Sequence, residues 1–225
     1  MKNLLAGAAV ATVALCGAAS AATFDFIAIT DGGSFTNTNN VVQTNGEADW
    51  NTKVGGPAVG ILDTASGISV IGSATTSDAN ISALAYFDGG SAGLGVCGVV
   101  NGSGQCAPGN DDNIGAIGGS SNAGDGTFEV LTLTFNSVVK LTDVLFQAEG
   151  HGDFTGTVKV NGVLQNVVGG NWDAGGLIAS VFNFEYIPVA HNQGSTNEFY
   201  IGTATVTNVP LPAGLPLLLA GMGKR

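Results

Sequence analysis

Hydrophobic and polar positions alternate over short segments along most of the chain, and glycine, asparagine or aspartate bounds each segment. Alternation with a period of two between turn residues is typical of β-strands. Seven segments have this pattern: residues 24–30, 67–76, 81–87, 128–135, 138–147, 178–187 and 198–207. No amphipathic helix is predicted after residue 22. Many short strands without helices predict an all-β fold, an antiparallel two-sheet sandwich of the jelly-roll or Ig-like kind.

Two segments carry stronger local signals. Residues 128–135 read FEVLTLTF, and their hydrophobic residues do not all fall on one face, so a central strand buried on both faces is predicted. Asn161 and Gly162 lie between the β-branched runs 157–160 and 163–164. An Asn-Gly pair in this context favours a type I′ turn, because both central residues of that turn need a positive φ. A two-stranded hairpin is therefore predicted at this position.

The N-terminus has the order of segments found in secretory signal peptides. Lys2 is followed by an uncharged apolar run, residues 4–15, and then by the small residues 17–22. This order predicts a signal peptide over residues 1–22, cleaved after Ala21 or Ala22. A retained membrane anchor is the alternative, but the apolar run is shorter than the ~20 residues of a spanning helix.

The C-terminus contains a second recognisable signal. The motif Val209-Pro210-Leu211-Pro212-Ala213 precedes an apolar segment, and Lys224 and Arg225 end the chain. These residues resemble the VPLPA variety of the PEP-CTERM sorting signals, which exosortase-type membrane enzymes of Gram-negative bacteria recognise and cleave. The resemblance implies a sorting signal over residues 209–225 and transient association with the inner membrane.

The length of this tail is the point at which it departs from the family. As a helix, residues 211–222 would extend roughly 18 Å, against about 30 Å of membrane hydrocarbon. Tails of the family continue further before a longer arginine cluster, so this one is a truncated or degenerate variant. The alternative is a hydrophobic terminus without a role. Residues 23–208 remain as one domain, predicted to be the β-sandwich.

Charge limits the partners of this domain. Between the two end signals the domain contains three lysines and all seventeen acidic residues of the chain, so its net charge is about −14. Nucleic acid is therefore excluded as a partner, because phosphate neutralisation requires clustered cations. The acidity is compatible with Ca²⁺ binding and equally with solubility through net charge.

The cysteines agree with export. Cys16 lies within the predicted signal peptide, which leaves Cys97 and Cys106 in the domain. A pair nine residues apart in a glycine-rich loop of an exported protein predicts a disulfide. A metal site at these two thiols is not expected, because a second cysteine pair and a neighbouring histidine are both missing from the sequence around them.

One segment has residues suited to binding a cation. It contains a GLGV run at residues 93–96, the cysteine loop, Asp111-Asp112-Asn113 and then Glu129 at the start of a strand. This succession resembles a pattern seen in many PEP-CTERM-type proteins, and the resemblance continues through residues 139–146 and 151–153. Asp111, Asp112, Asn113 and Glu129 would supply the hard oxygen ligands that Ca²⁺ takes, although not in EF-hand spacing. The competing interpretation is that aspartate and asparagine form turns in this loop.

Catalytic motifs are missing from the sequence. His151 and His191 are the two histidines, and neither belongs to an HExxH or G-x-S-x-G context. The carboxylates Glu149 and Asp153 could act as an acid and base pair, which makes a secreted glycan-active hydrolase the alternative function. The larger aromatic residues are expected to pack in the core, with a sugar-binding face as the alternative; they are Trp50, Trp172, Tyr86, Tyr186 and Tyr200.

The sequence as a whole predicts a non-enzymatic, exported protein. We expect exosortase processing to place it on the cell surface or in the extracellular matrix, with a structural or adhesive role. Extracellular polysaccharide is the leading ligand class.

Overall fold

The computed structural model describes residues 20–43, 46–78, 80–107, 112–116, 128–187 and 198–209. These residues contain thirteen strands and two five-residue helices. In chain order they are β1 (Ala21–Asp25), α1 (Phe26–Thr30), β2 (Phe35–Asn37), β3 (Val42–Gln43), β4 (Ala48–Asp49), α2 (Trp50–Val54), β5 (Ile61–Leu62), β6 (Ser69–Thr76), β7 (Leu84–Asp88), β8 (Gly93–Cys97), β9 (Glu129–Ala148), β10 (Gly156–Val160), β11 (Val163–Val167), β12 (Asn171–Glu185) and β13 (Phe199–Asn208).

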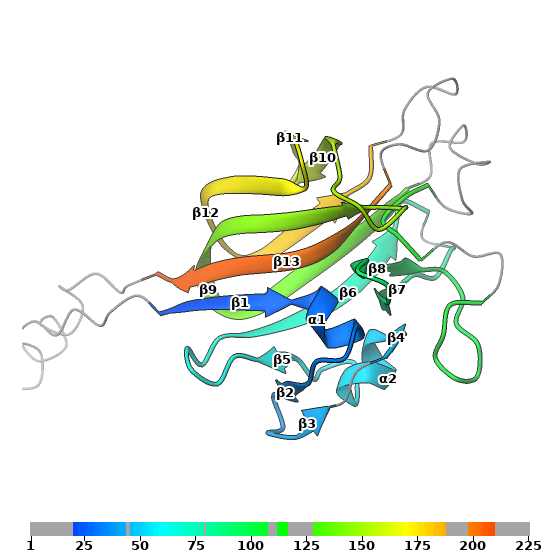
Figure 1. Cartoon of the computed structure of the whole chain (residues 1–225), viewed down its shortest axis with the longest axis horizontal. Coiled ribbons are helices and arrows are strands. Elements are labelled where there is room, and N and C mark those ends of the chain that lie inside the picture. Colours follow the sequence, from blue (N-terminus) through cyan, green and yellow to red (C-terminus); the bar gives the residue numbers. More distant parts are fainter. Residues whose placement is uncertain are drawn as a thin grey trace, which may run out of the picture.

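All strands join in one antiparallel, hydrogen-bonded sheet that bends over to form a two-layer sandwich (Figure 1). The long strands β9 and β12 pass through both layers. The first half of β9 pairs with β6, its second half pairs with β13, and β12 follows both halves with two register shifts. The structure thus confirms the predicted all-β antiparallel sandwich.

The bend in β9 explains one difference from the predicted strands. Residues 128–135 and 138–147 were expected as separate strands, but β9 runs through both of them. Asn136, Ser137 and Val138 are exposed at the bend, where the strand passes from one layer to the other. The central position of β9 is confirmed, with one face buried and the other half-buried over its first seven residues.

Aromatic side chains fill the space between the layers. Phe24 of β1 packs on Phe135 of β9 with ring centroids 5.8 Å apart. Phe146 contacts Phe184 of β12 at 6.0 Å and Phe199 of β13 at 5.4 Å. All five rings are buried, and each such ring removes a large apolar area from water, which makes this cluster a main source of stability.

The predicted hairpin is confirmed. β10 and β11 pair from Gly156 opposite Val167 to Val160 opposite Val163. The two turn residues, Asn161 and Gly162, have φ angles of 48° and 80°. These are the positive values that a type I′ turn requires.

Two short helices were not predicted from the sequence. Residues 24–30 were expected to be a strand, but β1 ends at Asp25 and α1 begins at Phe26. Asp25 caps α1 by accepting a hydrogen bond from Ala28 N, and Asp49 caps α2 in the same way through Asn51 N and Thr52 N. Capping by aspartate stabilises a single helical turn that is too short to show helical periodicity. Within the described residues, no helix is long and apolar enough to cross a membrane.

Both ends of the described domain lie at the same end of the sandwich (Figure 1). β1 pairs with β13 from Ala21 opposite Thr207 to Asp25 opposite Thr203. The sheet therefore begins at Ala21, within the last two residues of the predicted signal peptide, and finishes one residue before the predicted sorting signal. β13 has ten residues, so its start at Phe199 lies roughly 30 Å away, at the opposite end of the sandwich.

Candidate functional site

A short segment, residues 112–116, crosses the end of the sandwich that is remote from the termini; we call it the strap. Ile114 pairs with Phe199 of β13, and Ala116 pairs with Phe128 just before β9. These two bridges join the strap to both layers. Ile114 and Ala116 are fully buried, so the strap closes this end of the core.

The strap explains two glycines of the GLGV run. A Cβ atom added to Gly95 would overlap the carbonyl oxygen of Asp112, which passes directly over β8. A Cβ atom on Gly93 would lie 2.5 Å from the carbonyl oxygen of Ile201 in β13, and the φ of Gly93 is +113°. Glycine is thus required at both positions, for close backbone approach and, at Gly93, also for the backbone angle.

Three of the four predicted Ca²⁺ ligands lie within the described residues, while Asp111 lies outside them. Asn113 belongs to the strap, and Glu129 is the first residue of β9. Glu129 Oε2 accepts a hydrogen bond from Gly115 N at 3.1 Å, and Glu129 N donates to Gly115 O at 3.1 Å. These two hydrogen bonds hold Glu129 against the strap. The loop that contains the strap therefore folds back onto the start of β9.

Glu198 is a third buried oxygen-bearing residue at this place, and it was not predicted from the sequence. A Cβ atom on Gly115 would overlap both Asn113 Oδ1 and Glu198 Cγ, so both side chains lie close to Gly115. Asn113, Glu129 and Glu198 are each less than 4% exposed. Its position is the signal that could have identified Glu198 in the sequence. Glu198 immediately precedes β13, and Glu129 is likewise at the start of β9. We call Asn113, Glu129 and Glu198 the strap cluster.

Asp112 has a different immediate partner. Its Oδ1 accepts a hydrogen bond of 2.6 Å from the hydroxyl of Tyr200 in β13. Among the residues that the structure describes, no three His, Cys, Asp or Glu side chains converge so as to hold a metal ion. The strap cluster provides two carboxylates and one amide, and a complete Ca²⁺ site needs further oxygen ligands.

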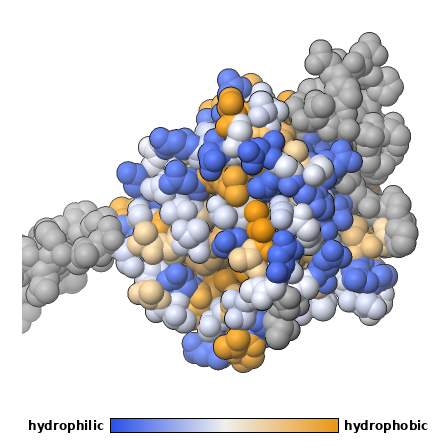
Figure 2. Space-filling model, viewed as in Figure 1, coloured by the Kyte–Doolittle hydropathy of each residue, from blue (hydrophilic) through white to orange (hydrophobic). Residues whose placement is uncertain are grey.

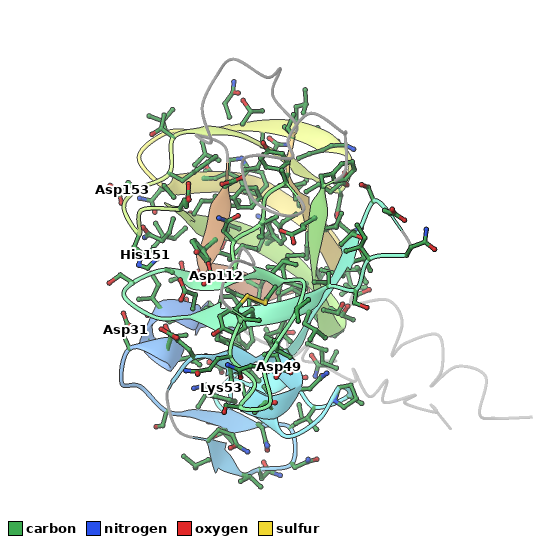
Figure 3. The ribbon with its side chains drawn as sticks, turned by 90° about the vertical axis from the view of Figure 1, so that its right-hand side faces the viewer. Asp31, Asp49, Lys53, Asp112, His151 and Asp153 are labelled. Atoms are coloured by element: carbon green, nitrogen blue, oxygen red, sulfur yellow. A yellow bond between two sulfur atoms is a disulfide. The ribbon has the colours of Figure 1, made fainter. Side chains whose placement is uncertain are left out.

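A second polar group lies on the same end of the molecule. His151 Nε2 is 3.2 Å from Asp88 Oδ2, and His151 Nδ1 is 2.8 Å from the carbonyl oxygen of Gly90. The ring of His151 also meets the ring of Tyr200 edge to face at 5.8 Å. Figure 3, which looks onto this end, shows the labelled side chains of His151 and Asp112 in the same region of this end.

Burial perturbs the ionisation of Asp88. Desolvation raises the pKa of Asp88 to about 6, and the negative charge of Asp112 acts in the same direction. His151 and the hydroxyl of Tyr200 act against this rise. Both ring nitrogens of His151 are engaged, by Asp88 and by a backbone carbonyl, whereas the histidine of a catalytic triad must keep one nitrogen for its nucleophile.

Burial also perturbs the ionisation of Lys53. Burial lowers the pKa of Lys53 to about 8, while its Nζ donates a hydrogen bond of 2.7 Å to the carbonyl oxygen of Gly46. Lys53 lies in the last turn of helix α2. This cation is therefore used inside the fold, where it fixes the segment before β4 to the helix.

The predicted disulfide is confirmed. Cys97 and Cys106 are bonded, with their Cα atoms 5.9 Å apart. Cys97 is the last residue of β8, so the bond fastens the loop from Gly98 to Cys106 to the sheet. A hydrogen bond of 2.9 Å from Asp49 N to Gly104 O holds the tip of the same loop against the start of α2.

A groove of about 280 Å³ lies between β1 and the strands β2 and β5. Its lining includes hydroxyl groups and two carboxylates, together with the buried rings of Phe24 and Phe35. The polar lining residues are Thr23, Asp25, Ser34, Thr36, Asp63 and Thr64. On the coloured part of the face shown in Figure 2, hydrophobic residues occur in small groups separated by hydrophilic ones.

The remaining predicted site residues are spread over the fold. Trp50, Trp172, Tyr86, Tyr186 and Tyr200 are all buried, which is the packing role that the sequence favoured over a sugar-binding face. Glu149 and Asp153 are both exposed, in the turn between β9 and β10. Val209 is the last described residue of the sorting motif, and Pro210, Leu211, Pro212 and Ala213 lie outside the described residues, as does His191.

Comparisons with protein-family models, with curated proteins and with solved structures gave no match for this chain.

Proposed function

We propose that this chain is an exported protein of the cell surface or extracellular matrix, with a structural or adhesive role. In this proposal a signal peptide directs export, and an exosortase-type enzyme cleaves the VPLPA-type tail. The β-sandwich is the part that remains and acts.

The observation that carries this proposal is the position of the chain ends relative to the strap. Ala21 pairs with Thr207, so both predicted signals leave the sandwich at one end. The strap cluster and the Asp88–His151 pair lie at the other end, roughly 30 Å away along β13. A domain held at the cell surface by its C-terminal end would present these polar groups outward.

The disulfide supports export independently of the end signals. Disulfides such as Cys97–Cys106 form and persist in oxidising compartments and are rare in the cytosol. The bond fastens a surface loop to the sheet, which stabilises that loop against opening. This fits a protein that must last outside the cell.

Calcium is the cofactor that we propose for the strap. Asn113, Glu129 and Glu198 bring amide and carboxylate oxygens together in a buried place, and Asp111 and Asp112 precede them in the chain. Buried carboxylates are costly unless charge or hydrogen bonds compensate them. Ca²⁺ takes this class of ligand, and its binding would fasten the strap to β9 and β13.

Carbohydrate is the ligand class that we propose for the groove. Hydroxyls, carboxylates and apolar side chains together line the groove, and a sugar ring has both hydroxyl groups and apolar C–H faces that such a lining can contact. A glycan array with the mature protein, with and without Ca²⁺, tests this. Ser34→Arg should block the groove and abolish binding, while Ser137→Arg, also exposed but at the bend of β9, should leave it unchanged.

The same array distinguishes the proposed adhesive role from the alternative function, a glycan-active hydrolase. If the glycans are cleaved, and cleavage is lost in Glu149→Gln or Asp153→Asn, the protein is a hydrolase. Binding without cleavage, lost only in the groove variant, supports the proposed adhesive role.

A further inference from the structure

The first strand of the sandwich includes residues that the predicted signal-peptide cleavage would remove. Ala21 and Ala22 pair with Thr207 and Val206 of β13. Before them, the carbonyl oxygen of Ser20 accepts a hydrogen bond of 3.2 Å from Asn208 N. Cleavage after Ala22, within the range expected from the sequence, would remove all three contacts.

These residues contribute to the fold. Ala22 is 2% exposed and belongs to the hydrophobic core. β1 has five residues and, among the described strands, pairs only with β13. Without Ala21 and Ala22 it would keep three pairs, Thr23 to Asp25, and the end of β13 would lose the strand that covers it.

The sequence offers more than one register for cleavage. A signal-peptide cleavage site needs small residues one and three positions before the cut bond. Gly17 and Ala19 satisfy this for a cut after Ala19, and Ala18 and Ser20 for a cut after Ser20. Ala19 and Ala21 satisfy it for a cut after Ala21, and Ser20 and Ala22 for a cut after Ala22. The small-residue rule alone does not distinguish these four registers, but only the first of them leaves both Ser20 and the whole of β1 on the mature protein.

We propose that signal peptidase hydrolyses the bond between Ala19 and Ser20, two to three residues earlier than the sequence pattern alone suggested. One water molecule is consumed: Ala19 becomes the carboxylate end of the leader, and the nitrogen of Ser20 becomes the new α-ammonium group. The inference rests on the proposed export, because it concerns the enzyme that completes it.

Mass spectrometry of the N-terminal peptide tests the inference on the full chain exported from a Gram-negative cell. The expected mature N-terminus is Ser20. A terminus at Ala21, Ala22 or Thr23 would overturn the inference and leave export intact. A chain that keeps Met1 would instead contradict export itself, so the two failures are distinguishable.

Variants at Ala19 and Ala21, the residues before two of these cuts, provide a matched pair. Ala21→Leu places a large residue directly before the cut that follows residue 21. Ala21 is exposed in β1, so the fold tolerates leucine there. We expect this variant to be processed at Ser20 as efficiently as the wild type. Ala19→Leu should prevent that processing. Loss of processing in Ala21→Leu, or normal processing at Ser20 in Ala19→Leu, would contradict the proposed site.

Discussion

His151 Nε2 lies 3.2 Å from Asp88 Oδ2, and this contact joins the turn after β9 to the end of β7. The same histidine reaches Gly90 O through its other ring nitrogen, while Asp31 accepts hydrogen bonds from Gly90 N and Ser91 N at 2.9 and 2.7 Å. Three segments distant in the sequence thus meet at one tight turn. The buried carboxylate of Asp88 beside this turn makes the stability of the domain depend on pH.

Asp88 should make the domain more stable at pH 5 than at pH 7.5. Its pKa is about 6 in the folded protein and 3.8 ordinarily, so between these values the folded state binds more protons. The contribution of this group to the free energy of unfolding therefore falls as pH rises through 6, by about 1 kcal/mol between pH 5 and 7.5. Urea denaturation at the two pH values measures the difference.

The variant Asp88→Asn tests whether Asp88 causes this change of stability with pH. It should remove the fall in stability between pH 5 and 7.5, because asparagine does not ionise. Asp153→Asn, which changes an exposed carboxylate in the turn next to His151, is the control and should keep the wild-type slope. An unchanged slope in Asp88→Asn would show that another group is responsible.

Calcium should stabilise the domain through the strap cluster. Binding raises the free energy of unfolding by about 2.7 kcal/mol when free Ca²⁺ is one hundred times Kd. For a domain of this size that is a rise in Tm of roughly 5 to 10 °C. Scanning calorimetry with millimolar Ca²⁺, and then with chelator, measures it.

The controls for calcium separate binding from screening. Mg²⁺ at equal ionic strength should give a smaller shift than Ca²⁺. Asp112→Asn, Glu129→Gln and Glu198→Gln should each reduce the response, whereas Asp173→Asn, at an exposed position of β12, should not. Equal shifts in Tm with both ions, or wild-type responses in the Asp112, Glu129 and Glu198 variants, would mean that the strap is only a turn.

Gly95 should be sensitive to the smallest substitution. In Gly95→Ala the new methyl group would overlap the carbonyl oxygen of Asp112, so the strap must move away from β8. We expect a loss of stability of about 1 to 3 kcal/mol, together with a weaker response to Ca²⁺. Gly102→Ala is the control, because a Cβ atom at Gly102 meets no atom within 4 Å. Equal stability of the two variants would show that the strap does not pass over β8.

Reduction of Cys97–Cys106 should destabilise the domain by about 2 to 3 kcal/mol in the chain-entropy model, because the bond closes a loop of about ten residues. Denaturation of the Cys97→Ser, Cys106→Ser double variant measures the loss. The native protein should show no free thiol at these positions when alkylated under denaturing, non-reducing conditions. Labelling of both cysteines would refute the disulfide.

The sequence predicted those parts of the fold that depend on local pattern. Alternation identified β6 and β13, and the Asn161-Gly162 pair identified the hairpin with its positive φ angles. The helix α1 was missed because its cause is a single cap, Asp25, and because one helical turn is too short for the shared burial of Phe26 and Ile29 to show a helical period. Alternation does not separate a helical turn from a strand over five residues.

The candidate site was predicted in part, and the missing part depends on distant pairing. Glu129 was identified because it follows the strap in the sequence and lies at the start of a predicted strand. Glu198 is far from the strap in the sequence and reaches it only because the next residue, Phe199, pairs with Ile114. Contacts of this kind depend on strand order and register, which the local pattern of one chain does not specify.

The measurement that tests the central claim most directly is the mass of the native protein recovered from the cell surface and culture medium. Export followed by exosortase cleavage predicts a chain that has lost its leader and ends within the Val209–Ala213 motif, one to five residues after β13. Intact protein ending at Arg225 on exported material would contradict the account.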